Sequence, residues 1–273
     1  MILASASPLT FFLALGASIA YVASAIGSSR QFEDSQLSHV VRMMVVSLAW
    51  ALHGALLVWS LLGIEPKFGF APALSMTAWL VGLVYALESH IYPQLKIPGL
   101  LSWAGAMTVV LALVFPGHVL PANASVWLPL HWALGIASYG LFAIAVVHAW
   151  LMTQAEGRIR VADATPSGLP LLTMERLTFR FVSVGFVLLS ATLLLGFLFG
   201  HHLYGVGHVV QWDHKAAFSV LSWLTFAVLM VGRLRFGWRG RLAVRVLYVG
   251  SSLLLLAYAG SRFIMEVVLG AGL

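Results

Sequence analysis

Histidines are the residues of this chain that could carry chemistry: the 273 residues include ten of them and no cysteine. Without thiols, disulfides and thiol exchange are excluded, and a metal ion or haem must be held by His, Met, Tyr or carboxylate side chains. The sequence also lacks a nucleotide-binding glycine loop, an HExxH motif, a nucleophile elbow and a CxxCH motif for covalent haem attachment. Histidines within or beside apolar runs therefore become the candidates.

Two histidines lie in long apolar runs. His53 falls near the middle of LAWALHGALLVW, where an ionisable side chain is costly and usually faces a partner, a cavity or a cofactor. A hydrogen bond to a neighbouring helix is the alternative. His131 opens the run PLHWALGIASYGLF, whose small residues would admit either a flat ligand or another helix. Position alone leaves both alternatives open at each histidine.

Further candidates lie in the segment GHHLYGVGHVVQWD, from Gly200 to Asp213, and just after it. The spacing of its histidines matches no tight zinc or iron motif, and His-rich outer loops are commonly only solvated. Trp212 and Asp213 end the segment, where a tryptophan is by default part of the aromatic belt. The histidines of this group are His201, His202, His208 and His214.

The elements that must position these residues are transmembrane helices. The chain is 61% hydrophobic and 9% charged, whereas soluble domains average about 25% charged residues. Apolar runs of about 18 or more residues recur, each long enough to cross a bilayer. We expect an all-α, polytopic membrane helical bundle with about eight spans, and one domain over residues 1–273 because no linker or repeat interrupts it. The expected spans are 6–27, 40–63, 71–89, 97–115, 125–152, 177–200, 214–233 and 243–268.

The arginines predict the orientation of these spans. They cluster in the gaps after the first, third, fifth and seventh spans, whereas the opposite gaps hold only Lys67 and Lys215. The positive-inside rule therefore places the Arg-rich gaps in the cytoplasm and both termini on the periplasmic side. The run from Ile2 to Ile26 has no preceding Lys or Arg, so we expect a retained first helix rather than a signal peptide. The net charge of +6 then indicates contact with the lipid bilayer and its anionic lipid, not with nucleic acid.

Four motifs stand out in the second half of the chain. They are MERLTFRFVSVGFVLLSATLLLGFLFG (Met174–Gly200), QWDHKAAFSVLSWLTF (Gln211–Phe226), RLRFGWRGRLA (Arg233–Ala243) and YAGSRF (Tyr258–Phe263). Together they resemble the cytochrome c assembly protein family, the haem-handling group that includes CcsA and CcmC. The likeness is closest to its short YpjD-type branch of eight-helix inner membrane proteins. It implies a bacterial inner membrane protein that holds haem between outer-face histidines, beneath a Trp-rich loop that contains an Asp.

The resemblance assigns roles by position. It makes His131 the first outer-face histidine and His53 the membrane-embedded histidine, and both are therefore expected iron ligands. Trp212 and Asp213, followed by Lys215, match the end of the Trp-rich motif and become expected haem contacts.

The chain also departs from the family pattern. Val231 stands where the haem exporters have a second membrane histidine, and no histidine follows the last span. Haem iron is held by one His, by His and Met, or by two His, so the second axial ligand must come from elsewhere or be absent. The alternatives are His201, His202 or His208 outside, and Met44 or Met230 within the membrane.

Three functions follow as hypotheses. The first is a haem-binding inner membrane protein of cytochrome c assembly or haem trafficking, with haem b as cofactor and no turnover chemistry of its own; Arg262 or Lys215 would pair with the haem propionates. The second is a regulatory or accessory subunit, of haem synthesis or of another membrane protein, that has lost full haem handling. Its partner helices would pack on Gly185, Gly196, Gly250 and Gly260. A transporter ranks last, because inverted repeats and interrupted helices are lacking in the sequence.

Overall fold

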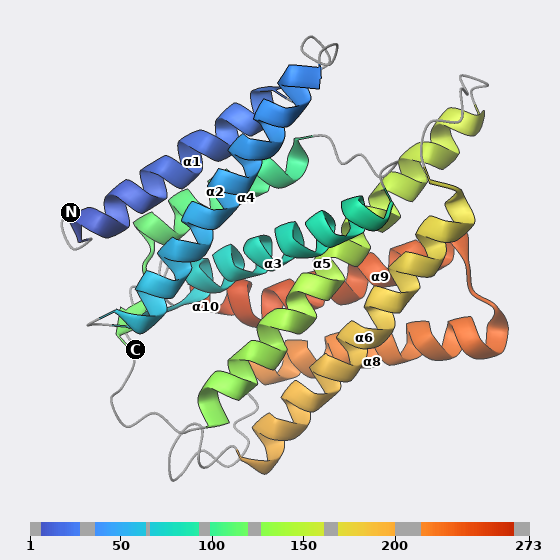
Figure 1. Cartoon of the computed structure of the whole chain (residues 1–273). Coiled ribbons are helices and arrows are strands. Elements are labelled where there is room, and N and C mark those ends of the chain that lie inside the picture. The colour runs from blue at the N-terminus through green and yellow to red at the C-terminus, as the bar shows by residue number, and fades with distance from the viewer. Residues whose placement is uncertain are drawn as a thin grey trace. The chain divides into compact units, whose positions relative to one another are not determined.

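A computed structural model describes residues 7–27, 36–63, 66–92, 99–119, 127–160, 169–199 and 214–264. Almost all of these residues lie in helices (Figure 1). The helices group into two compact units. The first holds the described residues up to His90 and those from 99 to 119, and the second holds Ile91, Tyr92 and the described residues from 127 onward. We describe each unit by itself.

The first unit contains four helices and two short strands. These elements are α1 (Pro8–Gly27), α2 (Gln36–Leu62), β1 (Lys67–Phe68), α3 (Phe70–Ile91), α4 (Leu100–Val114) and β2 (His118–Val119). Helix α1 packs against both α2 and α4. Its inner face carries Ala14 and Ala17, which are at most 1% exposed. Such small side chains let helix backbones approach closely without a loss of packing.

A reciprocal pair of tryptophans joins α2 to α3. The indole nitrogen of Trp50 donates to the carbonyl of Trp79 at 3.2 Å, and that of Trp79 donates to the carbonyl of Trp50 at 3.0 Å. The rings stack with their centroids 4.4 Å apart. Gly54 and Gly82 make room for them, since a Cβ at these positions would lie 3.0 and 3.3 Å from the indoles. Both polar indole groups are thus satisfied inside the unit.

The strands form a two-residue antiparallel ladder, in which Lys67 is opposite Val119 and Phe68 is opposite His118. It connects the segment after α2 to the segment after α4. Gly117 permits the close approach: its φ is 82°, and a Cβ there would lie 2.4 Å from the Phe68 backbone. The ladder therefore fixes the backbone position of Lys67.

The second unit consists of α5 (Trp127–Arg160), α6 (Leu171–Leu198), α8 (His214–Phe236), α9 (Gly240–Leu255), the π-helix η3 (Leu256–Gly260) and α10 (Ser261–Phe263). Its core is apolar and centres on Phe142 and Phe226, whose rings stack 3.8 Å apart with planes 4° from parallel. Gly185 lies against the ring of Phe142, and Gly250 lies against the ring of Phe226. The stack thereby ties four helices together.

Glu175 is the centre of a group of charged contacts at the Arg-rich end of the second unit. Its carboxylate accepts from Arg233 at 2.8 Å, and the side chain of Arg239 lies 3.9 Å away. The Arg233 guanidinium also lies 3.6 Å from the centre of the Phe179 ring. Trp238 packs on Gly232, where a Cβ would lie 2.3 Å from the ring. The acidic residue of the ERL motif and the arginine of GWRGR therefore meet in a structural contact.

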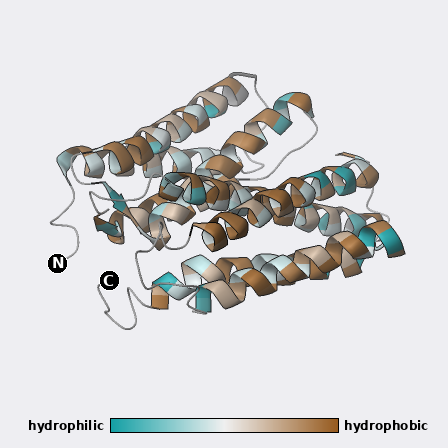
Figure 2. Ribbon diagram, turned by 90° about the horizontal axis from the view of Figure 1, so that it is seen from below, coloured by the Kyte–Doolittle hydropathy of each residue, from teal (hydrophilic) through white to brown (hydrophobic). Residues whose placement is uncertain are grey.

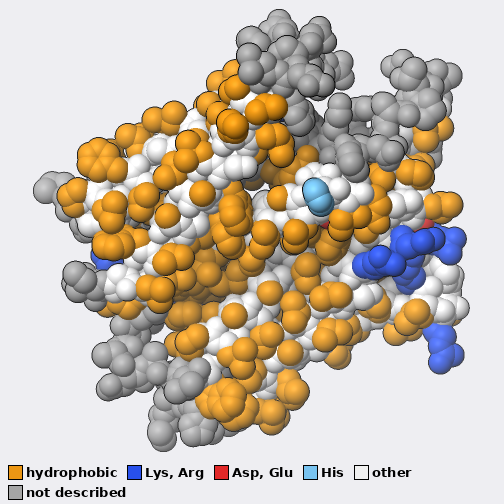
Figure 3. All heavy atoms as spheres, viewed as in Figure 1, with side chains coloured by type: hydrophobic (Ala, Val, Ile, Leu, Met, Phe, Trp, Pro, Cys, Tyr) orange, Lys and Arg blue, Asp and Glu red, His pale blue; other side chains and the backbone are white. Residues whose placement is uncertain are grey.

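Seven of the described helices are long and apolar enough to cross a membrane. The eighth, α4, has 15 residues, fewer than the predicted span of 97–115 and fewer than the roughly 20 that a span usually needs. Hydrophobic side chains dominate the face drawn in Figure 3, and the helices of Figure 2 carry long hydrophobic stretches. The exposed large hydrophobic residues include Phe12, Met107 and Phe197, each about two-thirds exposed. An apolar exterior of this kind fits lipid rather than water. The prediction of an all-α polytopic bundle is confirmed; periplasmic termini and a single domain stay predictions.

Candidate functional site

His53 lies at the centre of a buried hydrogen-bond chain in the first unit. Its side chain is fully buried. Its Nδ1 lies 3.1 Å from the hydroxyl of Tyr21 on α1, and its Nε2 lies 2.7 Å from the hydroxyl of Ser75 on α3. Both ring nitrogens are therefore engaged, and the imidazole cross-links three helices.

Tyr21 is itself held in place. Its ring meets that of His53 edge to face, with planes at 87° and centroids 5.7 Å apart. On α4, Gly105 leaves the space for the Tyr21 ring, since a Cβ there would lie 2.8 Å from its Cζ. The hydrogen-bond alternative for His53 is thus realised, and in this arrangement neither ring nitrogen is left to coordinate iron.

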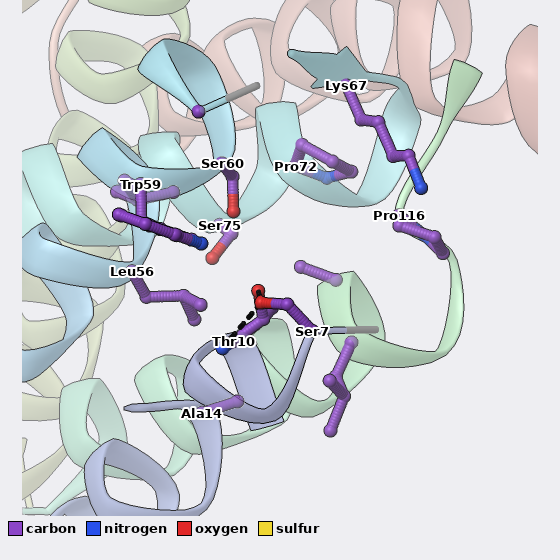
Figure 4. Close-up of a pocket in the computed structure, with 14 residues that line it drawn as sticks. Ser7, Thr10, Ala14, Leu56, Trp59, Ser60, Lys67, Pro72, Ser75 and Pro116 are labelled. Carbon is purple, nitrogen blue, oxygen red and sulfur yellow. Dashed lines mark hydrogen bonds between the residues drawn. The ribbon is translucent and has the colours of Figure 1, made fainter. Parts of the chain in front are cut away.

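Ser75 connects the chain to a cavity of about 350 Å³ (Figure 4). The cavity is lined by the first residues of α1, the end of α2, the beginning of α3, the end of α4 and Lys67 of β1. His53 does not line it. The hydroxyl of Ser75 is therefore the polar atom through which an occupant of the cavity would reach the buried imidazole.

His131 has a different environment, near the beginning of α5 in the second unit. Its Nδ1 is buried and has no hydrogen-bond partner among the described residues, and the ring lies near the backbone of Thr192 on α6. The ring lies against Gly196, where a Cβ would be 3.4 Å from Cε1. One turn away, Trp127 stacks on Phe199 at 4.6 Å. The helix ends thus present a histidine with an available nitrogen beside an aromatic pair.

Other predicted residues fall outside the described parts of the chain or in other surroundings. Trp212, Asp213, His201, His202 and His208 lie outside the described residues. Lys215 is the second residue of α8.

Met44 and Met230 are the two methionines predicted as second axial ligands. Met44 is exposed on a helix surface, and Met230 packs against the apolar core of the second unit. Met44 is 66% exposed, and it precedes His53 on the same helix by nine residues, about 13.5 Å along the axis. It cannot therefore share an iron atom with His53. The sulfur of Met230 accepts from Ser183 at 3.7 Å and packs on the core of the second unit.

Three of the four glycines expected to seat partner helices require a correction. Gly185, Gly196 and Gly250 each lie against a ring of this chain, those of Phe142, His131 and Phe226. These three are therefore used within the chain, because its own rings fill the space that they leave. Gly260 lies against Leu256 of its own preceding turn, and its role in seating a partner helix stays a prediction.

Three residues of these sites were not anticipated. Tyr21 and Ser75 are 32 and 22 residues from His53, and no local pattern links them to it. The one available signal is that a histidine inside a membrane needs polar partners from other spans. His148 on α5 is also buried, at 1% exposure, and meets Phe181 edge to face.

Tyr139 marks another unpredicted contact in the second unit. Its hydroxyl donates to the carbonyl of Leu254, two residues before the π-helix. That π-helix covers LAYAG, which overlaps the YAGSRF motif, and π-helical turns often occur at functional sites.

The fold and these sites define a multi-pass helical membrane protein. Both ring nitrogens of His53 are hydrogen bonded, whereas the Nδ1 of His131 has no hydrogen-bond partner among the described residues. The family model described as Cytochrome C assembly protein matches residues 7–269. The chain therefore belongs to the cytochrome c assembly protein family, and it is a multi-pass protein of the bacterial inner membrane.

The two relatives described next are at most 29% identical to this chain over the aligned residues. The inner membrane protein YpjD of Escherichia coli (strain K12) is 29% identical over 168 residues, which is 59% of this chain and 61% of YpjD. The match thus spans less than two-thirds of YpjD. The cytochrome c biogenesis protein CcsA of Synechococcus sp. (strain CC9902) is 25% identical over 269 residues, 86% of this chain and 85% of CcsA. No solved structure matches the chain significantly.

Proposed function

We propose that this protein binds haem b through His131 and acts in cytochrome c assembly or haem trafficking. One observation carries the assignment: the Nδ1 of His131 is buried and has no hydrogen-bond partner among the described residues. A metal-binding histidine needs one ring nitrogen that no protein group occupies, so that it can coordinate the metal. His131 therefore fits haem, whereas His53 does not fit it as arranged.

The other residues at this end would orient and shield the cofactor. The Trp127–Phe199 pair offers a flat aromatic wall, and the apolar faces of α5 and α6 would exclude water. Lys215 is proposed to pair with a propionate, as is Arg262 of α10. When bound, haem supplies an iron whose potential is set by its axial ligands. Trp212 and Asp213 remain proposed contacts, and the chain is assigned no turnover chemistry.

The family supports the biological role. The relative from Synechococcus is named a cytochrome c biogenesis protein and aligns with most of this chain.

Among the described residues, no group of three or more His, Cys, Asp or Glu side chains could hold a metal ion. A metal centre built from several such side chains is thus less well supported than a cofactor held by one histidine.

A second candidate is a regulatory or accessory subunit that has lost full haem handling. The state of His53 favours it, because both nitrogens of the expected membrane ligand are engaged with Tyr21 and Ser75. Val231, in place of a second membrane histidine, points the same way and is 52% exposed. Co-purification of one stoichiometric membrane partner with the full chain would favour this candidate.

The role is tested by deletion and complementation. Loss of the gene is expected to lower covalently haem-stained c-type cytochromes, and the wild-type chain is expected to restore them. His131→Ala should fail to restore them although it inserts at a normal level. His90→Ala, at an exposed histidine at the end of α3, is the matched control and should complement fully. Unchanged cytochrome c content after deletion would overturn the proposed function.

A further inference from the structure

The cavity of the first unit has the composition of a binding site. Its walls are mainly apolar, with Leu56, Leu113 and Pro72 among them, and hydroxyl groups are placed around it. Figure 4 shows the hydroxyls of Ser60 and Ser75 directed into the space. A volume of about 350 Å³ is near the lower end of the range for small-molecule sites, roughly 300–1,000 Å³. The cavity therefore has room for a small organic ligand and polar groups to orient it.

Lys67 is the one charged residue among the described residues that line this cavity. Its backbone is fixed by the pairing of β1 with β2, so the side chain starts from a defined position. The side chain extends toward Pro116, which lies on the same side of the cavity as Lys67 (Figure 4). Within the described residues, no ion pair involves its ammonium group. The cavity thus combines an apolar interior with a single positive charge.

This combination selects a ligand chemistry. An ammonium group in a partly apolar site interacts most favourably with a carboxylate or phosphate, because charge-assisted hydrogen bonds are about twice as strong as neutral ones. Apolar walls favour a hydrocarbon body, by about 0.8 kcal/mol for each buried methylene group. We propose that the cavity binds an amphiphile with one anionic head group at Lys67 and one short hydrocarbon chain along α1, α2 and α4.

The site is independent of haem. It lies wholly within the first unit, whereas His131 belongs to the second. Ser75 gives the occupant a second polar contact, and through it the ligand is coupled to the imidazole of His53. A single-chain fatty acid and a single-chain lysophospholipid share the required chemistry, and competition separates them.

The test is photo-crosslinking of the full-length protein in nanodiscs with a diazirine-labelled ten-carbon carboxylic acid, followed by peptide mass spectrometry. Label is expected on residues 7–14, 56–63 or 112–116. Lys67→Gln should weaken apparent binding about tenfold, the equivalent of about 1.4 kcal/mol, and Lys67→Arg should retain it. The control ligand is the diazirine-labelled ten-carbon alcohol, which has no carboxylate to pair with Lys67. Labelling of the wild type by this alcohol should be about as weak as labelling of Lys67→Gln by the acid.

A blocking variant keeps the test independent of charge. Ser60→Phe places a ring in the cavity and is expected to abolish labelling, while a thermal unfolding midpoint close to that of the wild type shows that the chain still folds. Competition by unlabelled decanoate supports a fatty acid, and competition only by lysophosphatidate supports a lysophospholipid. Equal labelling of the wild type, Lys67→Gln and Ser60→Phe would overturn the proposal, as would equal labelling by acid and alcohol.

Discussion

The expected haem-ligand histidines of the two units differ in the hydrogen bonding of their ring nitrogens. In the first unit, His53 is fully buried and both of its ring nitrogens are hydrogen bonded, to Tyr21 and to Ser75. In the second, His131 has one nitrogen that no described residue contacts by a hydrogen bond. The same residue type is thus a helix cross-link in one unit and, in the other, the candidate ligand of the proposed haem.

The difference shows why a histidine in an apolar run is ambiguous. A polar group far from water must be satisfied inside the protein, since an unmet hydrogen bond costs about 1–3 kcal/mol. His53 meets that requirement with two hydroxyls. The Nδ1 of His131 does not meet it among the described residues, and a bound metal would complete it. The partners of the ring, rather than its position along the span, separate a structural histidine from a candidate ligand.

Removing the His53 ring should have the largest effect on stability. His53→Ala leaves a cavity and strands the hydroxyls of Tyr21 and Ser75, so we expect a loss of about 3 kcal/mol in unfolding free energy. Thermal unfolding in one mild detergent, compared with the wild type, measures it. Ser222→Ala is the control in the other unit: it removes one buried hydrogen bond, to the Gly250 carbonyl, and should cost about 1 kcal/mol. An unfolding midpoint unchanged in His53→Ala would refute the cross-link.

A methyl group at two glycines should disturb the two cores to a similar degree. Gly105→Ala places a Cβ 2.8 Å from the Tyr21 ring, and Gly250→Ala places one 2.9 Å from the Phe226 ring. Both rings are confined, so each substitution should cost about 2 kcal/mol through overpacking. The same unfolding assay applies. Gly157→Ala, where a Cβ would meet nothing within 4 Å, is the matched control and should not destabilise the chain.

The ion pair at the Arg-rich end should matter less. Glu175→Gln removes the charge that faces Arg233, whose side chain is 25% exposed. Because solvent screens a pair of this exposure, we expect a loss of about 1 kcal/mol that shrinks as salt is raised. Unfolding at low and high salt provides the readout. A larger loss at high salt would show that the contact is not electrostatic.

His131→Ala should have the smallest effect on stability, about 0.5 kcal/mol, because the Nδ1 of the removed ring has no hydrogen-bond partner among the described residues. The apo protein, prepared from haem-depleted cells, is the sample for this comparison. A loss as large as that expected for His53→Ala would indicate that both histidines are structural.

Much of the fold could be predicted from the sequence because apolar length is a direct physical requirement of the bilayer. The predicted span 6–27 corresponds to α1 (Pro8–Gly27), and 214–233 to α8 (His214–Phe236). Helix ends were less accurate where the helix continues beyond the apolar run. Helix α5 extends to Arg160, past the predicted end at residue 152, since polar residues continue a helix without adding hydropathy.

The site could be predicted only in part. The candidates His53 and His131 follow from apolar context and family resemblance, but their hydrogen-bond partners do not. Tyr21 and Ser75 reach His53 from other helices, and that packing is decided by small residues such as Gly105 whose neighbours are far apart in sequence. The role of Lys67 depends on the pairing of two-residue strands, which no hydropathy pattern reveals.

The most direct test is an absorption spectrum, oxidised and reduced, of the wild type, His131→Ala and His53→Ala, each purified in mild detergent from haem-replete cells. His90→Ala serves as the control for the loss of any histidine. We predict haem bands in the wild type and in His90→Ala, and their loss in His131→Ala. His53→Ala should retain haem in proportion to its folded fraction. Haem bands that persist in His131→Ala, or that disappear from folded His53→Ala alone, would contradict the assignment.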